Sequence, residues 1–351
     1  MNFYEVFSLE IMYRCGTRVC KGVRWKQSTQ NYECQLMRNV CNIRRQLFNG
    51  TYKSKGFNKS RRRERGKERI IQSVHISERN VQMCLCDYCL MPTFAPTFIY
   101  DNSACIKDKG VSFAVSRLKT HLHRYYLENN SNDGYILLFD VKNFFGSIDH
   151  KKLLDATKKK IEDQRLYNLF AYFINCFEGE KGLGLGSQVS QVSSAIFMNQ
   201  FDHYFKDYLR IKYYARYMDD GYIICRSKEK LKQLKEEIIQ FFYSLGLTPN
   251  INKTQIFKLS NGFTYLKRRF ILHENGKIVV KPNKANILRY KRRFSKLVKK
   301  YRNNEVKFSK VLDLNRNFKG YLKEFNYYDR YTKTIKGAED ICLLLNKKSQ
   351  T

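Results

Sequence analysis

The sequence predicts an α+β fold, a small antiparallel sheet backed by helices, and three observations support this. A short continuous apolar run, YILLFD at 135–140, is typical of a buried central strand that ends on an aspartate. Two strand-like segments flank a pair of aspartates in IKYYARYMDDGYIIC at 211–225, and Asn275-Gly276 marks a second hairpin. Helical apolar patterns fill most of the remaining chain.

The elements are expected in the following order. Residues 1–50 are helical, and Asn49-Gly50 ends the last helix. A strand at 70–76 follows the very basic segment 51–69, and 77–129 is mostly helical. Beyond the strand at 135–140, helices are expected at 150–161, 192–209 and 227–246, with a Gly-rich turn at 182–191. From about residue 282 the pattern predicts basic amphipathic helices, including RYKRRFSKLVKKYR at 289–302.

The composition is strongly basic, since 66 Lys and Arg against 32 Asp and Glu give a formal net charge of +34. With 43% hydrophobic and 15% aromatic residues, the chain is too apolar for a disordered basic tail. Such an excess on a folded chain indicates a polyanionic partner, with nucleic acid as the first candidate and an anionic membrane surface as the second. No apolar run approaches the roughly 20 residues that span a bilayer, and no signal-peptide pattern is present. A cytoplasmic protein without a membrane partner is therefore expected.

The chain has 11 cysteines without regular spacing, which predicts reduced thiols. Cys84, Cys86 and Cys89 lie close together in the sequence. A metal there needs a fourth ligand, and His75 and Cys105 stand at spacings that fit no usual zinc site. The alternative, small apolar side chains on a buried helix, is favoured.

Three carboxylates predict a metal site. Asp140 ends one strand, and Asp219 and Asp220 lie on a hairpin, so the three converge if these strands are neighbours. Such a cluster is costly unless cations neutralise it, and Mg²⁺ prefers oxygen ligands. Two Mg²⁺ ions, with Mn²⁺ as the alternative, would support an in-line phosphoryl displacement. The alternative is a helix cap at Asp140 and an ordinary hairpin turn at Asp219-Asp220.

Several segments together resemble the motifs of reverse transcriptases. RYMDD at 216–220 resembles their aspartate hairpin, and LLFDVKNFFGSIDH at 137–150 resembles their first catalytic motif. GLGLGSQVSQ at 182–191 resembles the loop that supports the templating pair, and LGLTPNINKTQ at 245–255 the motif after the hairpin. KERIIQSVHISERNVQ and PTFAPTFIYDNSACIKDKG are similar to the fingers motifs of bacterial, non-retroviral enzymes. The resemblance covers residues 45–270 approximately.

The resemblance implies a right-hand polymerase fold with fingers, an antiparallel-sheet palm and a helical thumb. The expected division is an N-terminal extension with fingers at 1–130, a palm at 131–281 with inserted fingers helices, and a basic thumb at 282–351. It also implies RNA-directed DNA synthesis by two-metal nucleotidyl transfer. The implied partners are an RNA template, expected to be a structured non-coding RNA, the cDNA or primer, and dNTPs. A homo-oligomer or an accessory protein stays open. An RNA-dependent RNA polymerase and an RNA-binding scaffold with a retired active site are the alternative functions.

Residue roles follow from the matched motifs. Asp140 and Asp219 are the implied metal ligands, with Asp220 as the third carboxylate. Phe145 matches the steric gate that excludes a ribose 2′-hydroxyl, and core packing is its alternative. Lys253 matches a general acid that protonates the leaving pyrophosphate, and a simple surface lysine is its alternative.

Further residues are implied to contact the nucleotide. Lys67 and Arg69 match fingers residues that hold the triphosphate, and a solvated basic loop is their alternative. Ser190 and Gln191 match the loop under the nucleotide. Leu185 stands where many reverse transcriptases have a glutamine that contacts the nucleotide, so lower fidelity is expected.

The loop ending Ser190-Gln191 is similar to that of diversity-generating retroelements and of stand-alone enzymes in phage defence. Antiphage defence is favoured as the biological role, with an error-prone diversity-generating enzyme as the alternative. Tyr265-Leu266-Lys267 departs from the usual Phe-Leu-Gly of the primer grip. The retron signature Val-Thr-Gly is absent.

Overall fold

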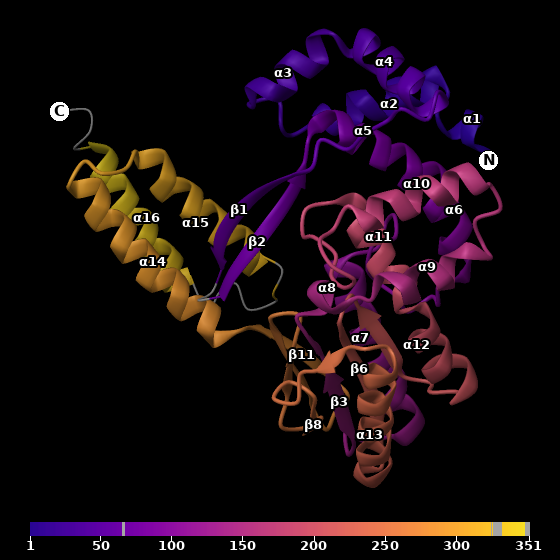
Figure 1. Ribbon diagram of the computed structural model, residues 1–351. Helices are drawn as coiled ribbons and strands as arrows, with labels where there is room; N and C mark the ends of the chain where they lie inside the picture. Colours follow the sequence, from indigo (N-terminus) through magenta and orange to yellow (C-terminus); the bar gives the residue numbers. More distant parts are fainter. Residues whose placement is uncertain (65–66, 324, 326–331, 348–351) are drawn as a thin grey trace. The chain divides into compact units, whose positions relative to one another are not determined.

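The computed structural model of the protein describes residues 1–64, 67–323, 325 and 332–347. The chain forms two compact units. The first contains 1–118, 137–223 and 229–255, and the second contains 119–136, 224–228 and 256–351. Helices and strands occur in both, as the α+β prediction requires (Figure 1).

The N-terminal segment is helical, as predicted. It forms α1 (Phe3–Val6), α2 (Leu9–Cys20), α3 (Gln27–Cys34) and α4 (Leu36–Phe48). The side chains of Asn2 and Ser8 cap α1 and α2 by accepting hydrogen bonds from backbone N–H groups in the first turn. In α4, apolar residues at helical spacing face the interior, and the helix ends just before Asn49-Gly50, where Gly50 has φ +68°.

The basic segment before the predicted strand is itself a strand, which the sequence analysis did not predict. β1 (Phe57–Glu64) pairs antiparallel with β2 (Lys67–Val74) along the full length of both. Arg61 forms a salt bridge of 3.5 Å with Glu68 of the other strand, and the charged side chains described in this ribbon are exposed to solvent.

The segment after β2 is mainly helical, as predicted. It contains α5 (Ile76–Leu85), η1 (Cys86–Leu90), α6 (Met91–Phe94), η2 (Ala95–Thr97) and α7 (Val111–Asn129). Cys84, Cys86 and Cys89 are buried on α5 and η1. Their burial on helical segments is what the favoured prediction of a buried helix requires.

The central sheet confirms the predicted strand at 135–140. β3 (Tyr135–Phe139) lies between β6 (Asp220–Cys225) and β8 (Gln255–Lys258) in a sheet of order β5-β6-β3-β8, where β5 is Tyr214–Tyr217. A smaller sheet pairs β4 (Val141–Lys142) with β7 (Thr248–Pro249). Ile136, Leu137 and Phe139 are buried, as expected for a central strand.

A series of helical segments follows β4 along the chain. They are α8 (Phe144–Ser147), α9 (His150–Lys158), α10 (Gln164–Asn175), α11 (Gln188–Phe197), α12 (Asn199–His203), η3 (Tyr204–Tyr208) and α13 (Lys228–Ser244). Two of them, α12 and α13, contact Phe139 of the sheet through aromatic rings. Phe201 of α12 stacks on Phe242 of α13 with centroids 4.9 Å apart, and Phe139 of β3 lies 5.6 Å from Phe201. These contacts hold the sheet in place.

The helix that was expected to begin at residue 192 begins earlier in the structure. α11 begins at Gln188, because the hydroxyl of Ser187 caps it by accepting a hydrogen bond from Ser190 N. Ser190 and Gln191 therefore lie on a helix and not in the Gly-rich turn.

The second unit contains the predicted hairpin and basic helices. β9 (Phe263–Tyr265), β10 (Arg268–Leu272) and β11 (Ile278–Pro282) form a sheet of order β11-β10-β9. α14 (Lys284–Arg302), α15 (Phe308–Lys323) and α16 (Thr332–Lys347) share one apolar core, in which Tyr290 stacks on Phe318. No helix in the described ranges has both the length and the apolar character that crossing a membrane requires.

Candidate active site

The three predicted carboxylates meet in the first unit. Asp140 directly follows β3, Asp219 lies in the turn after β5, and Asp220 begins the neighbouring strand β6. One carboxylate oxygen from each residue lies within 4.8 Å of the others. The prediction that these strands are neighbours and bring the carboxylates together is therefore confirmed.

A buried ion pair holds the turn that carries two of the carboxylates. Arg216 of β5 and Asp202 of α12 both have fully buried side chains and form a salt bridge. Arg216 Nη1 also donates a hydrogen bond of 2.6 Å to the carbonyl of Met218, which has a left-handed backbone with φ +55°. The sequence analysis missed this pair. The only local signal is an arginine in a strand that is otherwise apolar and aromatic.

The electrostatics of the cluster favour a bound cation. Burial, followed by the charge of Asp140, raises the pKa of Asp219 to about 6. Burial, a hydrogen bond with Asp140 and the charge of Asp219 raise the pKa of Asp220 to about 8. Burial and the mutual repulsion of the carboxylates thus disfavour three ionised groups at this place, unless a cation lies beside them. Three hard carboxylate oxygens are a donor set that suits Mg²⁺ or Mn²⁺.

Lys253 and Asn250 both contact Asp140. Lys253 Nζ lies 2.8 Å from Asp140 Oδ2, and Asn250 Nδ2 donates to the same oxygen at 2.7 Å. Burial by itself would lower the pKa of Lys253, but the hydrogen bond and charge of Asp140, with the charges of Asp220 and Asp219, raise it. Lys253 therefore belongs to the carboxylate cluster. Asn250, which lies in the same sequence motif, was not singled out from the sequence.

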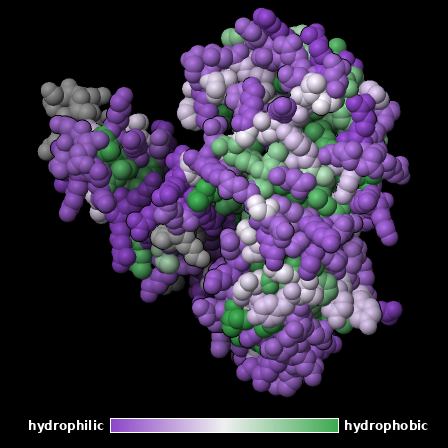
Figure 2. Space-filling view, viewed as in Figure 1, coloured by the Kyte–Doolittle hydropathy of each residue, from purple (hydrophilic) through white to green (hydrophobic). Residues whose placement is uncertain are grey.

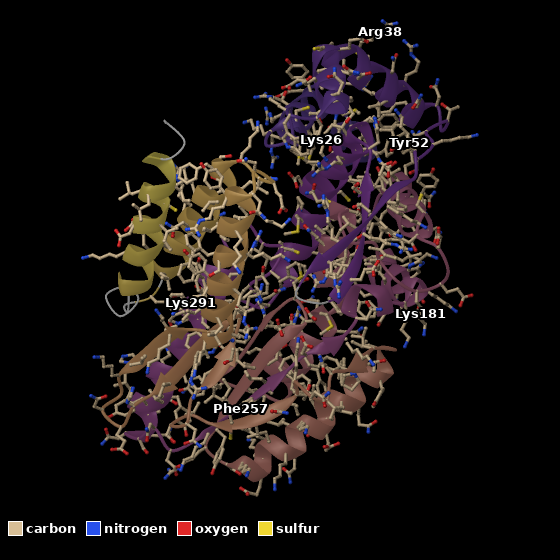
Figure 3. All side chains as sticks on the ribbon, turned by 90° about the vertical axis from the view of Figure 1, so that its left-hand side faces the viewer. Lys26, Arg38, Tyr52, Lys181, Phe257 and Lys291 are labelled. Carbon is tan, nitrogen blue, oxygen red and sulfur yellow. The ribbon has the colours of Figure 1, made fainter. Side chains whose placement is uncertain are left out.

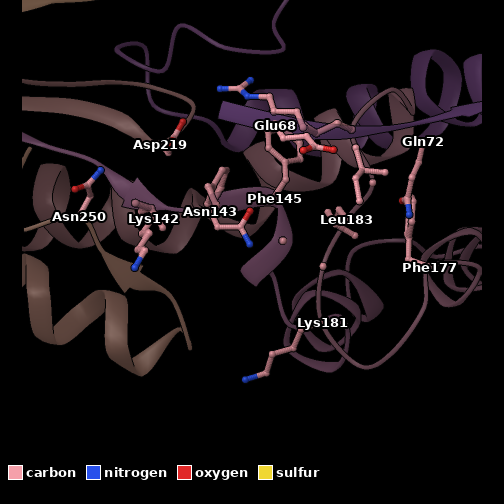
Figure 4. Close-up of a pocket in the computed structure, with 18 of the residues that line it drawn as sticks. Glu68, Gln72, Lys142, Asn143, Phe145, Phe177, Lys181, Leu183, Asp219 and Asn250 are labelled. Carbon is pink, nitrogen blue, oxygen red and sulfur yellow. The ribbon is translucent and has the colours of Figure 1, made fainter. Parts of the chain in front are cut away.

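The cluster borders a cavity of about 710 Å³. Asp140, Asp219 and Lys253 line it together with Phe145 and residues of β2 and of the Gly-rich turn (Figure 4). In the view of Figure 4, Phe145 lies between Asp219 and Gln72. The half-buried ring of Phe145 contributes to the cavity wall, so core packing alone does not describe it.

β2 packs against the Gly-rich turn at this cavity. Gln72 N donates a hydrogen bond of 2.7 Å to the carbonyl of Leu185, and both residues line the cavity. A Cβ on Gly184 would lie 2.1 Å from Gln72 Oε1 and 2.7 Å from the Phe177 ring, so a larger residue here requires these side chains to shift. The structure thus places the predicted Leu185 beside Gln72, a residue the sequence analysis did not name.

The other residues that the sequence predicts to contact the nucleotide do not all line the cavity. Arg69 of β2 lines the cavity. Lys67 begins β2, but its side chain lies outside the described part of the structure. Gln191 is exposed on α11 and is not among the cavity-lining residues, and Ser190 is buried there. The structure therefore does not bring Gln191 to the cavity, and its role stays a prediction.

Comparisons with known proteins agree with this geometry. Residues 57–288 match the family described as reverse transcriptase (RNA-dependent DNA polymerase). The chain is 24% identical over 178 residues to protein YkfC of Escherichia coli K12, which covers 39% of this chain and 47% of YkfC.

Two solved telomerase structures are also similar. The Candida albicans telomerase, solved in complex with a fragment of telomeric RNA, has a TM-score of 0.50 at 10% identity, covering 81% of this chain and 55% of that one. The truncated apo telomerase of Candida tropicalis has a TM-score of 0.47 at 16% identity, covering 64% of this chain and 54% of that one. The chain thus spans about half the length of these relatives, and the C. albicans likeness shows the fold alone.

The predicted right-hand polymerase fold is therefore confirmed by the antiparallel sheets with their covering helices and by the C. albicans likeness. Because the family match spans residues 57–288, well over half of the 351 residues, the chain belongs to the reverse transcriptase family of RNA-directed DNA polymerases.

Proposed function

We propose that the protein copies an RNA template into cDNA. The observation that carries this proposal is the convergence of Asp140, Asp219 and Asp220 at the edge of a cavity that Arg69 and Phe145 also line. The cavity volume of about 710 Å³ suits a nucleotide-sized ligand, and cavities of roughly 300–1,000 Å³ are usual for such ligands.

The three carboxylates would hold two Mg²⁺ ions, with Mn²⁺ as the alternative. When bound, these ions supply the positive charge that stabilises attack of the primer 3′-hydroxyl on the α-phosphate. Arg69, with Lys67 as its expected companion, positions the triphosphate over the carboxylates. Lys253 Nζ, held beside Asp140, donates a proton to the leaving pyrophosphate. Positioning and preorganised charge supply most of the rate enhancement.

Selectivity for deoxynucleotides is assigned to Phe145. Its ring lines the cavity next to Asp140 and would collide with a ribose 2′-hydroxyl. This assignment favours DNA synthesis over the alternative of an RNA-dependent RNA polymerase.

We keep the expected division of the chain as a proposal. The N-terminal extension and fingers are residues 1–130, the palm is 131–281 and the thumb is 282–351. The basic residues on the exposed face of α14 support the thumb assignment, because they can contact the phosphates along a nucleic-acid backbone. The apolar face of the same helix packs into the core. On the face shown in Figure 2, hydrophilic residues also cover most of the surface. The exposed basic residues of α14 are Lys284, Arg289, Lys291, Arg292, Arg293, Lys296, Lys299 and Arg302.

The partner is proposed to be a dedicated structured RNA. The net charge of +34 supports a nucleic-acid partner, and the C. albicans telomerase structure contains an RNA fragment. The loop ending Ser190-Gln191 supports a stand-alone enzyme of antiphage defence, acting in the cytoplasm, or an error-prone enzyme of a diversity-generating retroelement. These finer roles rest on the sequence resemblance.

One experiment tests the proposal. Nucleic acid that co-purifies with the wild type and with Asp219→Ala/Asp220→Ala, each expressed with native flanking DNA, is sequenced. We expect a specific RNA with its cDNA on the wild type and the RNA alone on the variant. Asp155→Ala is the matched control, because Asp155 is an exposed carboxylate on α9 outside the cavity.

The outcome separates the alternatives. RNA without DNA on both proteins would contradict the proposal and favour an RNA-binding scaffold. Incorporation of NTPs in preference to dNTPs by the purified wild type would instead favour an RNA polymerase.

A further inference from the structure

The first unit contains a second cavity that the polymerase site does not use. Its volume is about 620 Å³, and it is bounded by α3, α4, the segment leading to β1 and the start of α5. None of its lining residues is shared with the cavity at the carboxylates. A volume of this size suits a nucleotide-sized ligand, given the usual range of roughly 300–1,000 Å³.

One wall of this cavity is a stripe of side-chain amides. Gln35, Asn39, Asn42 and Gln46 all line it and follow one face of α4, with successive spacings of four, three and four residues. The neighbouring face of α4 carries the apolar residues that pack into the core. Gln35, Asn42 and Gln46 are exposed, so these three amides are not part of the buried core. We call this cavity, with its wall of Gln35, Asn39, Asn42 and Gln46, the amide pocket.

Most of these amides have unused hydrogen-bonding capacity. Among the residues that the structure describes, none forms a hydrogen bond with the side-chain amide of Gln35, Asn42 or Gln46. Asn39 uses only its Nδ2, which donates to the carbonyl of Tyr32 at 3.0 Å. Each primary amide offers both donors and an acceptor. Such paired groups match the hydrogen-bonding edges of nucleobases.

Charge is distributed unevenly around the amide pocket. Lys53 and Lys55 are exposed, and in the described part of the chain neither forms a salt bridge. Glu78 is only 2% exposed, and its carboxylate accepts hydrogen bonds from Ser54 Oγ at 2.6 Å and from Lys55 N at 3.1 Å. A phosphate would therefore bind near the exposed lysines, and the buried acid would repel it from the interior.

An aromatic ring completes the lining. Tyr52 is half-buried, and its ring packs edgewise against Tyr172 and Phe173 with centroids 6.4 and 6.2 Å away. Tyr52 and the basic side chains Lys26 and Arg38 of the same region are labelled in Figure 3. A rigid aromatic ring beside amides and lysines is the combination with which proteins bind single-stranded RNA, whose unpaired bases can stack and form hydrogen bonds.

We propose that the amide pocket binds an unpaired nucleotide of a single-stranded RNA segment. The base contacts the amide stripe and Tyr52, and the phosphate contacts Lys53 and Lys55. This inference rests on the proposed function in one respect, since it takes RNA to be the partner of the chain.

The test measures binding of homopolymeric single-stranded RNAs of about eight nucleotides, a length typical of such sites, by fluorescence anisotropy. We expect the full-length protein to prefer one base roughly tenfold, the scale of a good amide–base pair. Asn42→Ala/Gln46→Ala should remove this preference while leaving the salt dependence of binding unchanged. The matched control is Arg38→Ala/Arg45→Ala on the same helix, outside the pocket lining. Because the proposal gives these two arginines no contact with the base, this variant should keep the base preference.

Competition experiments show whether the bound nucleotide belongs to an RNA, to a DNA or to a free mononucleotide. Single-stranded DNA of the same sequence and free nucleoside monophosphates should bind more weakly than the RNA. The proposal is wrong if the wild type shows no base preference or if the alanine variant keeps it. Equal binding of DNA, or of a free monophosphate, also overturns it, because the ligand is then not an RNA segment.

A second measurement uses the wild type alone and does not depend on the folding of a variant. RNA is cross-linked to the protein by ultraviolet light, and the tryptic peptides are identified by mass spectrometry. We expect a cross-linked nucleotide on peptide 46–53, which carries Gln46 and Tyr52. Cross-links only elsewhere contradict the proposal. Failure of the polymerase function would be recognised separately, as a wild type that incorporates no dNTPs.

Discussion

Arg216 and Asp202 form a fully buried salt bridge directly beneath the turn that carries Asp219 and Asp220. The same guanidinium donates a hydrogen bond to the carbonyl of Met218, the residue before Asp219. The backbone position of the two carboxylates thus depends on an ion pair between β5 and α12.

Removing one partner of this pair should therefore be costly. For Asp202→Asn we expect a loss of about 3–5 kcal/mol in the free energy of unfolding, because the Arg216 charge stays buried without its partner. Urea unfolding measures this loss. Asp207→Asn is the matched control, since Asp207 is 63% exposed and pairs only with His203 in the residues described. Its effect should stay below about 1 kcal/mol. Equal effects of the two substitutions would contradict the assigned role.

Glu78 should make stability depend on pH. Burial raises its pKa from the usual 4.5, although Ser54 and Lys55 donate hydrogen bonds to it. The folded state therefore holds a proton that the unfolded state has released, and stability falls as pH rises from 4.5 through the folded pKa. Relative to Glu78→Gln, the wild type should lose stability as the pH rises above 4.5. Unfolding curves at several pH values measure this, and a constant difference would argue against it.

Gly184 and Gln72 should be energetically coupled. In Gly184→Ala the new Cβ would lie 2.1 Å from Gln72 Oε1, so either the Gln72 side chain or the Gly-rich turn must shift, and dNTP incorporation should fall. Gln72→Ala should restore part of the loss, although the Phe177 ring also lies close to the new methyl. A double-mutant cycle on the rate of incorporation measures the coupling. Gly110→Ala, where a Cβ meets nothing within 4 Å, is the control. Strict additivity would contradict this contact.

Phe145→Ala should open the cavity to ribonucleotides. We expect the ratio of NTP to dNTP incorporation to rise by roughly tenfold or more, since the steric exclusion of the 2′-hydroxyl is lost. Primer extension with each nucleotide set gives the ratio. Phe257→Ala removes a half-buried ring from β8, outside the cavity lining, and should leave the ratio unchanged. An unchanged ratio in Phe145→Ala would show that another group selects the sugar.

Leu185→Gln should raise fidelity. Leu185 lines the cavity and offers the nucleotide no side-chain hydrogen bond, whereas glutamine at this position could fix the base pair. Sequencing of cDNA copied from a defined template by wild type and variant gives both error rates. Equal rates would remove the explanation for reduced fidelity.

Local patterns in the sequence were sufficient for much of the fold. The apolar run at 135–140 predicted the central strand, and the Asp-Asp pair between two strand-like segments predicted the hairpin, because burial on both faces and tight turns have strong local signals. The three carboxylates were also named in advance, since like charges at the end of a buried strand and in a hairpin break the local rules. The strand β1 was missed, because a run of arginines carries no apolar alternation.

Only the tertiary structure decided which distant residues meet. Arg216 and Asp202, Asn250 and Asp140, and Gln72 and Gly184 are separated along the chain, and no local propensity reports a pairing of this kind. The sequence analysis did not single out the amide stripe of α4, because its role as the wall of a cavity depends on the packing of α3 and α5 around it. Sequence by itself determined most of the elements and the three carboxylates that cluster, whereas their supporting contacts arise from packing and buried hydrogen bonds that exist only once the chain has folded.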